Sequence, residues 1–299
     1  MSMLYSKAGS LLLRIFGLIP LRLARFIACT QELILRLFNN DLHRVSRINL
    51  RLVKPGIDEK QLTKLTQQSV QSTLTNAFEM PIIWQHDNAW VIRHIESITN
   101  EEIISQALAG NRGVITLCPH VGNWEVFGRK LTAYGPTTYL YQPPKQKIME
   151  SLVRERREKS GAKLAPTSQR GIASLLKALR NNEIIGILPD QVPKGESGMF
   201  VPFLGVPSYT MTLVYSLIKK TQCRVVLGYA LRTNSGFKVI FKQVDTKIYS
   251  ENIETSLLGL SRTVEQSLSE DFSQYQWGYK RFKKQPDGHY PYKKNNVTA

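Results

Sequence analysis

The stretch Thr116-Leu-Cys-Pro-His120-Val-Gly-Asn-Trp-Glu125 is where an apolar run gives way to a segment of helical periodicity. Residues 114–118 predict a short buried strand, and the proline after them ends it because proline has no N–H to donate to a sheet. Asn123 is typical of a helix N-cap, and apolar residues then recur at helical spacings. The stretch therefore predicts a strand that turns into a helix, with His120 in the turn and Glu125 in the first helical turn.

His120 and Glu125 together suggest general-base chemistry. An imidazole that is oriented by a carboxylate can remove a proton from a hydroxyl at neutral pH. We expect a ring nitrogen of His120 to contact the Glu125 carboxylate, with the substrate supplying the hydroxyl. On spacing alone the pair also fits a charged helix start that has no catalytic role, because charged caps are common.

The segments that follow predict an α/β fold. Apolar runs over residues 137–141 and 184–188 predict two further strands, and residues 169–180 predict an amphipathic helix between them. Strands that alternate with helices of about a dozen residues predict a mainly parallel central sheet with helices on both faces. In such sheets ligands bind at the carboxyl ends of the strands. His120 follows one predicted strand and Asp190 follows another, so both are expected at this edge.

The N-terminal segment, residues 11–38, is strongly apolar, but arginines interrupt every window that is long enough to span a bilayer. The apolar run has no cleavage site of the kind that ends a signal peptide. On a helical wheel the charged residues fall within roughly a quarter of the circumference: Arg14, Arg22, Arg25, Glu32 and Arg36. The pattern predicts a short segment before Pro20 and an amphipathic helix over residues 21–53.

Two interpretations of this helix remain open. A wide apolar arc beside an arginine-rich face favours a helix that lies in the membrane interface, with the arginines at anionic headgroups. The helix can instead pack on the body of the protein. We expect residues 1–53 to form an N-terminal membrane-associated helical segment and residues 54–299 to form the α/β domain.

Composition limits the class of protein and its partners. The 299 residues include 40 Lys and Arg against 23 Asp and Glu, a formal net charge of +17. This excess indicates an anionic partner: nucleic acid, an anionic lipid surface, a phosphorylated substrate or an acidic carrier protein. Cys29, Cys118 and Cys223 lie in apolar settings, which indicates free thiols in a reducing compartment rather than a disulfide framework.

Two later segments place apolar or aromatic residues where a sequence of this kind predicts loops or a polar surface. Residues 193–207 predict a loop rich in glycine and proline, whose Phe200 and Phe203 either pack on the core or line the wall of an acyl-chain site. Residues 277–294 interleave aromatic and basic side chains, a pattern found at single-stranded nucleic acids, membrane interfaces and phosphorylated glycolipids. No recognisable nucleic-acid-binding module accompanies this tail, so no nucleic acid is expected as a partner.

The order and spacing of several motifs resemble one family over most of the chain. The motifs are Arg47-Ile-Asn-Leu50, Cys118-Pro-His-Val-Gly-Asn-Trp-Glu125, Tyr141-Gln-Pro-Pro-Lys145, Arg154-Glu-Arg-Arg157, Gly186-Ile-Leu-Pro-Asp-Gln191, Phe200-Val-Pro-Phe-Leu-Gly-Val-Pro207 and Gln274-Tyr-Gln-Trp-Gly-Tyr-Lys-Arg-Phe282. Together they resemble the lipid A late acyltransferases of the lauroyl/myristoyl type, a branch of the glycerolipid acyltransferase superfamily whose motif is H-x-x-x-x-D/E. The resemblance runs from about residue 19 to residue 292.

The resemblance implies an enzyme that transfers a fatty acyl group from acyl carrier protein to the hydroxyl of a hydroxyacyl chain. The acceptor would be a Kdo-bearing, phosphorylated disaccharide, the lipid A precursor, at the cytoplasmic face of the anionic cell inner membrane. No cofactor and no metal are expected. A phospholipid or glycerol-phosphate acyltransferase remains the alternative enzyme, and a non-catalytic membrane or nucleic-acid-binding protein the alternative class.

The resemblance also implies roles for individual residues. His120 would be the base, oriented by Glu125, and the acyl group would pass directly to the acceptor. Arg157 would stabilise the site or grip a phosphate, since its charge is permanent and its guanidinium is bidentate. Asp190 would orient Arg157 or the loop after it. Cys118 is not expected to be acylated, because apolar neighbours raise a thiol pKa.

The remaining expected site residues contact substrate. Asn123 is a candidate hydrogen-bond donor to the oxyanion that forms during acyl transfer. Gln191, which follows Asp190 in the motif, is expected beside the same site. Phe200 and Phe203 are the candidates for contact with an acyl chain.

Overall fold

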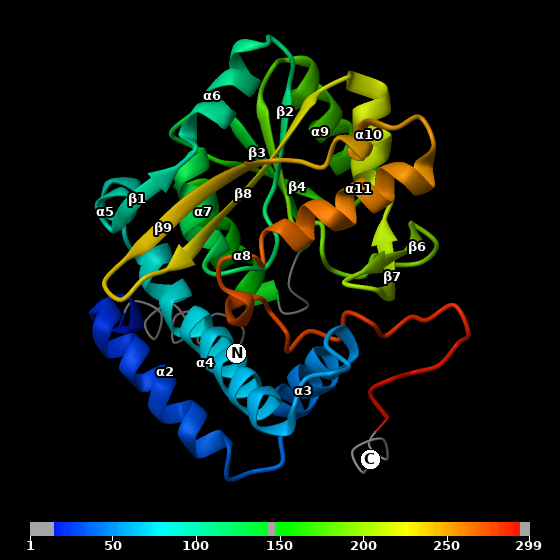
Figure 1. Cartoon of the computed structure of the whole chain (residues 1–299). Helices are drawn as coiled ribbons and strands as arrows, with labels where there is room; N and C mark the ends of the chain where they lie inside the picture. The colour runs from blue at the N-terminus through cyan, green and yellow to red at the C-terminus, as the bar shows by residue number, and fades with distance from the viewer. Residues whose placement is uncertain (1–14, 143–146, 294–299) are drawn as a thin grey trace.

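The computed structural model describes residues 15–142 and 147–293 (Figure 1). Residues 11–14 of the predicted N-terminal segment and residues 143–146 after Tyr141 lie outside the described residues. The strands are β1 (Ile95–Thr99), β2 (Val114–Leu117), β3 (Thr137–Tyr141), β4 (Lys163–Pro166), β5 (Ile184–Ile187), β6 (Gly198–Phe203), β7 (Val206–Met211), β8 (Arg224–Arg232) and β9 (Phe237–Gln243).

The α-helices are α2 (Leu21–Leu35), α3 (Asp41–Val53), α4 (Glu59–Gln85), α5 (Asn88–Arg93), α6 (Glu101–Ala109), α7 (Trp124–Leu131), α8 (Lys147–Glu158), α9 (Gln169–Arg180), α10 (Leu213–Thr221) and α11 (Ile253–Gln266). Two short 3₁₀ helices, η1 (Thr246–Tyr249) and η2 (Phe272–Gln274), flank α11.

A seven-stranded sheet in the order β1-β9-β8-β2-β5-β3-β4 forms the centre of the molecule. Strand β2 lies between β8 and β5 and is parallel to both. Strands β8 and β9 are the one antiparallel pair in this sheet among the described residues. The prediction of a mainly parallel central sheet is confirmed, and β1 and β4 are edge strands that the sequence pattern did not predict.

Helices cover both faces of the sheet, as predicted. The alternation along β2 shows this, because successive side chains of a strand point to opposite faces. Ile115 and Leu117 belong to the hydrophobic cluster that includes residues of α9, α10 and α11. Val114 and Cys118 belong to a second cluster, which includes residues of α6 and α7. Figure 1 shows the same division of helices about the sheet.

The N-terminal part is two helices rather than the single helix predicted over residues 21–53. Asn40 ends one and starts the other: its Oδ1 accepts from the His43 backbone N–H at 3.0 Å, and its Nδ2 donates to the Leu35 carbonyl at 2.9 Å. One side chain thus satisfies backbone groups that both helix ends leave without partners. Both α2 and α3 pack on α4, which lies across the lower edge of the sheet in Figure 1.

Helix α2 packs with its charged stripe toward the protein. Arg25 donates to the buried carboxylate of Glu79, and Glu32 is itself buried against Arg36 and His43. Arg22, from the same predicted stripe, is exposed. The expectation that this stripe as a whole faces anionic headgroups is therefore wrong.

The apolar arc of α2 and of the turn after it is exposed instead. Its outermost side chains include Phe26, Leu33, Leu37 and Phe38, of which Leu37 is 80% exposed. Across residues 15–142 and 147–293, the helices are all too short or too polar to cross a bilayer.

The turn that leads from β2 to α7 depends on Gly122. Its φ is +59°, a left-handed conformation that glycine adopts without strain. A Cβ at this position would lie 2.0 Å from the Ala230 carbonyl oxygen. The turn can therefore pack on β8 only because position 122 has no side chain.

We expect Gly122→Ala to lower the free energy of unfolding by more than about 3 kcal/mol, because it adds a steric clash to left-handed strain. Gly195→Ala is the matched control, since Gly195 has a φ of +57° and open space around its Cβ position. The control should cost about 1–2 kcal/mol, from strain alone. Urea denaturation of both variants measures the difference, and equal losses would contradict the close approach.

Candidate functional site

His120 and Asp190 meet at the carboxyl ends of the adjacent parallel strands β2 and β5. The His120 Nδ1 atom lies 2.8 Å from Asp190 Oδ1, and the His120 backbone N–H donates to Asp190 Oδ2 at 2.9 Å. One carboxylate therefore fixes both the ring and the backbone of His120. The prediction that these two residues share an edge of the sheet is confirmed. The prediction that the His120 ring contacts Glu125 is wrong, because the ring contacts Asp190 instead.

The contacts of His120 determine which ring nitrogen is free to act as a base. The Gln191 side-chain amide nitrogen lies 3.1 Å from His120 Nε2. An amide nitrogen can only donate, so Nε2 accepts, and Nδ1 carries the ring proton and donates it to Asp190. The unprotonated Nε2 is thus directed away from Asp190 and toward Gln191. The His120 side chain is 12% exposed, and Gln191 is half-buried.

Asp190 is a buried carboxylate that stays ionised. Burial opposes its ionisation, but electrostatic attraction to His120, two hydrogen bonds from His120 and the charge of Arg281 outweigh burial and hold the pKa of Asp190 below its usual value. An ionised Asp190 can stabilise the imidazolium that forms when His120 takes a proton. The expectation that Asp190 orients Arg157 is wrong, because the hydrogen bonds of the Asp190 carboxylate are with His120 and Tyr275.

Glu125 and Arg157 form a second charged pair. Arg157 Nε donates to Glu125 Oε1 at 3.1 Å, and its terminal nitrogen also donates to Oε1. Burial would lower the pKa of Arg157, but the charge and hydrogen bonds of Glu125 raise it, so the guanidinium remains charged. The guanidinium also lies over the Tyr141 ring, 5.5 Å from its centroid. Glu125 therefore holds Arg157 rather than His120.

Asn123 has a structural role in the turn. Its Oδ1 accepts from the Val126 N–H at 3.1 Å and so caps α7, as the sequence predicts. Its Nδ2 donates to Glu79 at 2.8 Å, and the residue is fully buried. With both polar atoms engaged inside the protein, Asn123 is not directed toward substrate, and its predicted role as oxyanion donor is wrong.

Cys118 lies beneath the site and is not a nucleophile in this state. Burial, followed by the charges of Asp190 and Glu125, raises the pKa of the Cys118 thiol well above its usual value. A protonated, buried thiol reacts poorly. A small cavity of about 50 Å³ lies between Cys118, Glu125 and Arg157, with Tyr139 also in its wall.

Residues 198–211 form a β-hairpin of β6 and β7, where the sequence predicted a loop over residues 193–207. Phe203 is fully buried and packs against Tyr275 and Phe282 in the core. Its predicted contact with an acyl chain is therefore wrong in this structure. Phe200 is 38% exposed and packs on Tyr209 across the hairpin, so it remains open to a ligand.

Sequence reasoning missed the support that the C-terminal segment gives to the site. Gly122 donates its N–H to the Gln274 carbonyl at 3.0 Å, and Gln276 donates its N–H to the His120 carbonyl at 3.0 Å. These two bonds connect the turn to the end of η2 and to the residues directly after it. The motif at residues 274–282 is the sequence signal for this support, although its spacing does not predict which part of the fold it contacts.

Comparison with known proteins identifies the family of the chain. The model of the family described as bacterial lipid A biosynthesis acyltransferase matches residues 3–284. The chain is 26% identical over 250 residues to a lipid A biosynthesis acyltransferase of Haemophilus influenzae, covering 81% of this chain and 78% of the relative.

Two relatives from Escherichia coli match at similar levels. The lipid A biosynthesis lauroyltransferase is 22% identical over 243 residues, covering 80% of this chain and 78% of the relative. The lipid A biosynthesis palmitoleoyltransferase is 24% identical over 250 residues, covering 82% and 79%. Because the family model spans nearly the whole sequence, the chain belongs to the bacterial lipid A biosynthesis acyltransferases.

Proposed function

We propose that this acyltransferase moves a fatty acyl group from acyl carrier protein to the hydroxyl of a hydroxyacyl chain on a Kdo-bearing lipid A precursor. The observation that carries the proposal is the pair of contacts on the His120 ring: Asp190 Oδ1 lies at Nδ1 and the Gln191 amide nitrogen lies at Nε2, which favours Nε2 as the unprotonated nitrogen. This arrangement is that of a general base for a hydroxyl. Family membership supplies the class of substrate.

The transfer proceeds in a single addition and elimination. His120 Nε2 takes the proton of the acceptor hydroxyl as its oxygen attacks the thioester carbonyl carbon. The tetrahedral oxyanion collapses, the carbon–sulfur bond breaks, and the carrier's thiolate leaves and takes the proton back from His120. Asp190 keeps the ring oriented throughout. No acyl-enzyme forms, which agrees with the burial of the Cys118 thiol.

Gln191 and Arg157 have distinct roles in this scheme. The Gln191 amide occupies the position at His120 Nε2 that the acceptor hydroxyl takes when it binds, so Gln191 marks the substrate side of the ring. Arg157, kept charged by Glu125, supplies the positive charge for the oxyanion or for a phosphate of the glycolipid. Glu125 thus acts through Arg157.

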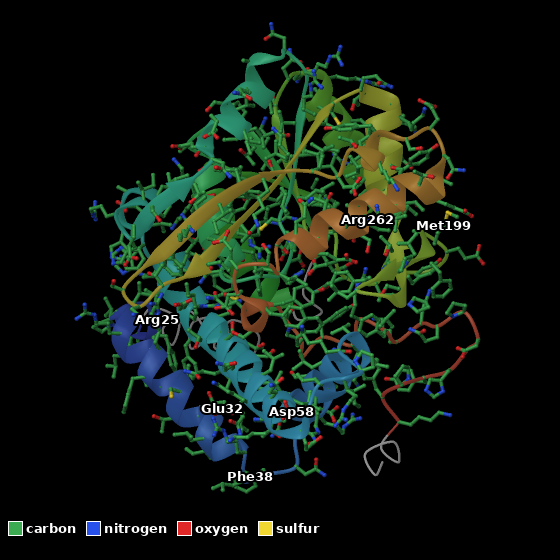
Figure 2. All side chains as sticks on the ribbon, in the orientation of Figure 1. Arg25, Glu32, Phe38, Asp58, Met199 and Arg262 are labelled. Atoms are coloured by element: carbon green, nitrogen blue, oxygen red, sulfur yellow. The ribbon has the colours of Figure 1, made fainter. Side chains whose placement is uncertain are left out.

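The exposed apolar arc supports a position at the membrane. We assign the membrane-associated segment to residues 1–53 and the acyltransferase domain to residues 54–299. The arc runs along α2 to Leu37 and to Phe38, which points away from the body at the lower end of the molecule in Figure 2. Apolar side chains in such an arrangement bind the acyl boundary of a bilayer.

A basic cavity beside this arc supports contact with anionic headgroups. It has a volume of about 860 Å³ and is lined by Arg36, Arg44, Arg47 and Arg51 together with Phe38 and His289. Glu59 also lines this cavity and pairs with Arg47 and Arg51. Its side chain is 60% exposed, so a phosphate can replace it as the partner of these arginines. The membrane in question is the inner membrane, approached from its cytoplasmic face, where an acidic carrier protein can be steered by the net charge of +17.

The purified protein, given acyl carrier protein thioester and a Kdo-bearing lipid A precursor, should yield an acceptor with one added acyl chain by mass spectrometry. His120→Ala should reduce the rate by at least about 10³-fold, since it removes the base. Cys118→Ala should stay within about threefold, because no acyl group passes through the thiol.

The same assay separates the alternatives. Preferential acylation of glycerol phosphate or a lysophospholipid would assign the enzyme to the phospholipid class. A full rate in His120→Ala, or an acyl group trapped on Cys118, would contradict the mechanism.

Asp190→Asn should lower the free energy of unfolding at pH 7, and the gap from the wild type should close in acid. The folded pKa of Asp190 lies below its unfolded value, so its contribution is present above the unfolded value of about 4 and is lost as pH falls through the folded one. Urea denaturation between pH 7 and pH 3 measures the gap. Glu254→Gln, at an exposed acid, is the control; a gap that widens in acid would refute the assignment.

Replacement of Phe26, Leu33 and Leu37 by serine should reduce binding to vesicles of any lipid by at least about 10²-fold, because each buried apolar side chain contributes about 1.5–3 kcal/mol. Arg47→Gln with Arg51→Gln should weaken binding to phosphatidylglycerol vesicles while leaving binding to phosphatidylcholine vesicles unchanged. Flotation measures both effects.

The matched controls remove side chains of the same kind elsewhere. Ile92→Ser removes an exposed apolar side chain from α5, and Arg154→Gln with Lys159→Gln removes two exposed charges from α8 and its C-terminal end. Equal losses in the controls would argue against a defined membrane face.

A further inference from the structure

Glu79 is a fully buried carboxylate on α4 that the mechanism does not use. It accepts from Arg25 Nε at 2.7 Å, from Arg232 Nε at 2.7 Å and from Asn123 Nδ2 at 2.8 Å. These donors come from α2, from the end of β8 and from the turn that follows His120. Four segments distant in sequence therefore meet at one carboxylate.

Two partners of Glu79 hold the turn that carries His120. Arg232 donates to the Gly122 carbonyl at 2.9 Å, and Asn123 caps α7 through its Oδ1. Glu79 fixes the side chains of both residues. The position of the turn, two residues after His120, is thus coupled to α4 by charge-assisted hydrogen bonds, which are stronger than neutral ones.

The third partner connects the same carboxylate to α2. Arg25 donates to the Thr233 carbonyl at 2.8 Å and to the Gly236 carbonyl at 3.0 Å, at the turn between β8 and β9. Figure 2 shows Arg25 at the end of α2 that lies beside this turn. Arg25 is therefore the side chain through which the helix with the exposed apolar arc reaches the Glu79 network.

The charges of this network predict a graded response to substitution. Glu79 faces two arginines, whose side chains are 15% (Arg25) and 8% (Arg232) exposed. Removing Glu79 leaves two nearly buried cations without a counter-charge, which is strongly unfavourable. Removing Arg25 leaves a balanced pair of Glu79 and Arg232, but disconnects α2 from it.

We propose that Glu79 is a positioning residue for acyl transfer. It fixes the position of the turn after His120, and through Arg25 it makes that position depend on how α2 packs on α4. The inference rests on the proposed function for its kinetic readout. Glu79 touches neither His120 nor substrate and acts through Asn123 and Arg232. A misplacement of a base by about 1 Å can cost 10²-fold in rate, so loss of the network should appear in kcat.

Glu32 provides a matched control. It is another buried glutamate that bridges N-terminal helices, and it is 1% exposed and bound to Arg36 and His43. Its contacts lie within α2, α3 and the segment between them rather than at the His120 turn. Glu32→Gln therefore removes a comparable buried carboxylate and should lower the melting temperature similarly.

The test compares Glu79→Gln, Arg25→Gln and Glu32→Gln in the full-length protein, at a temperature where all are folded by circular dichroism. Glu79→Gln should lower kcat by about 10²-fold with KM within about twofold. Arg25→Gln should lower kcat by about tenfold, and Glu32→Gln should keep kcat within about threefold. Normal kcat in Glu79→Gln, or an equal loss in Glu32→Gln, would overturn the proposal.

A further variant and an NMR measurement test the proposal even if Glu79→Gln does not fold or the enzyme catalyses a different reaction. Glu79→Asp keeps the charge but is one methylene shorter, so it should fold where Glu79→Gln does not and still lose part of kcat. In each variant NMR can follow the His120 Nδ1 proton, which Asp190 holds in the wild type. Its exchange with water should rise by at least about tenfold in Glu79→Gln and Glu79→Asp but not in Glu32→Gln, whatever reaction the enzyme catalyses. Unchanged exchange in both Glu79 variants would refute the positioning role.

Discussion

The parallel pairing of β2 with β5 is the constraint on which the site depends. Leu117 lies in register with Ile187, and the Cys118 N–H donates to the Ile187 carbonyl at 2.9 Å. Pro119 follows β2 and Pro189 follows β5, so both strands end at the same level of the sheet. The residues after the two prolines, His120 and Asp190, therefore lie side by side. A slip of one residue would turn every side chain of one strand to the other face. The packing that buries both faces of both strands therefore also fixes the distance between imidazole and carboxylate.

Helix α2 shows the reverse of the usual arrangement in a soluble protein. Two charged side chains of α2, Arg25 and Glu32, are turned inward to buried or half-buried partners, while several large apolar side chains are turned outward. Exposed apolar surface costs about 25 cal/mol per Å² in water. A lipid surface removes this cost while leaving the internal ion pairs intact. The arrangement is consistent with the proposed membrane-associated segment, in which ion pairs hold α2 on the protein and its exposed apolar side chains contact lipid.

Periodicity and turn residues predicted much of the central sheet. The strands over residues 114–118, 137–141 and 184–188 and the helix over residues 169–180 were confirmed within a residue, because their apolar patterns are set by burial on the two faces of one sheet. The short edge strands β1 and β4 were missed, since edge strands have a weaker burial pattern. The break between α2 and α3 was also missed, although Asn40 carried a capping signal.

The partner of His120 could not be predicted by the same means. Glu125 is five positions away along the chain and Asp190 is seventy, yet the strand order brings Asp190 to the ring. A helical wheel likewise identifies the charged stripe of α2 but not the side that faces the body. That choice depends on Glu79, whose position in space is set by the packing of α2 on α4. Spacing along the chain thus identified candidate site residues and the charged stripe of α2. Their contact partners depend on the tertiary fold, which spacing does not predict.

The position of the site relative to the exposed apolar arc of α2 bears on the energetics of the proposed reaction. The sheet edge that carries His120 is the edge on which α4 and the segment after η2 lie, and α2 and α3 pack on α4 (Figure 1). Withdrawing one acyl chain of a dozen carbons from a bilayer costs on the order of 10 kcal/mol, at about 0.8 kcal/mol per methylene. An enzyme in solution would need to recover that free energy in its own pocket. If the apolar arc lies in the bilayer, the glycolipid keeps its chains in hydrocarbon and presents only its hydroxyl to His120. Membrane attachment would then be part of how the reaction becomes possible as well as where it occurs.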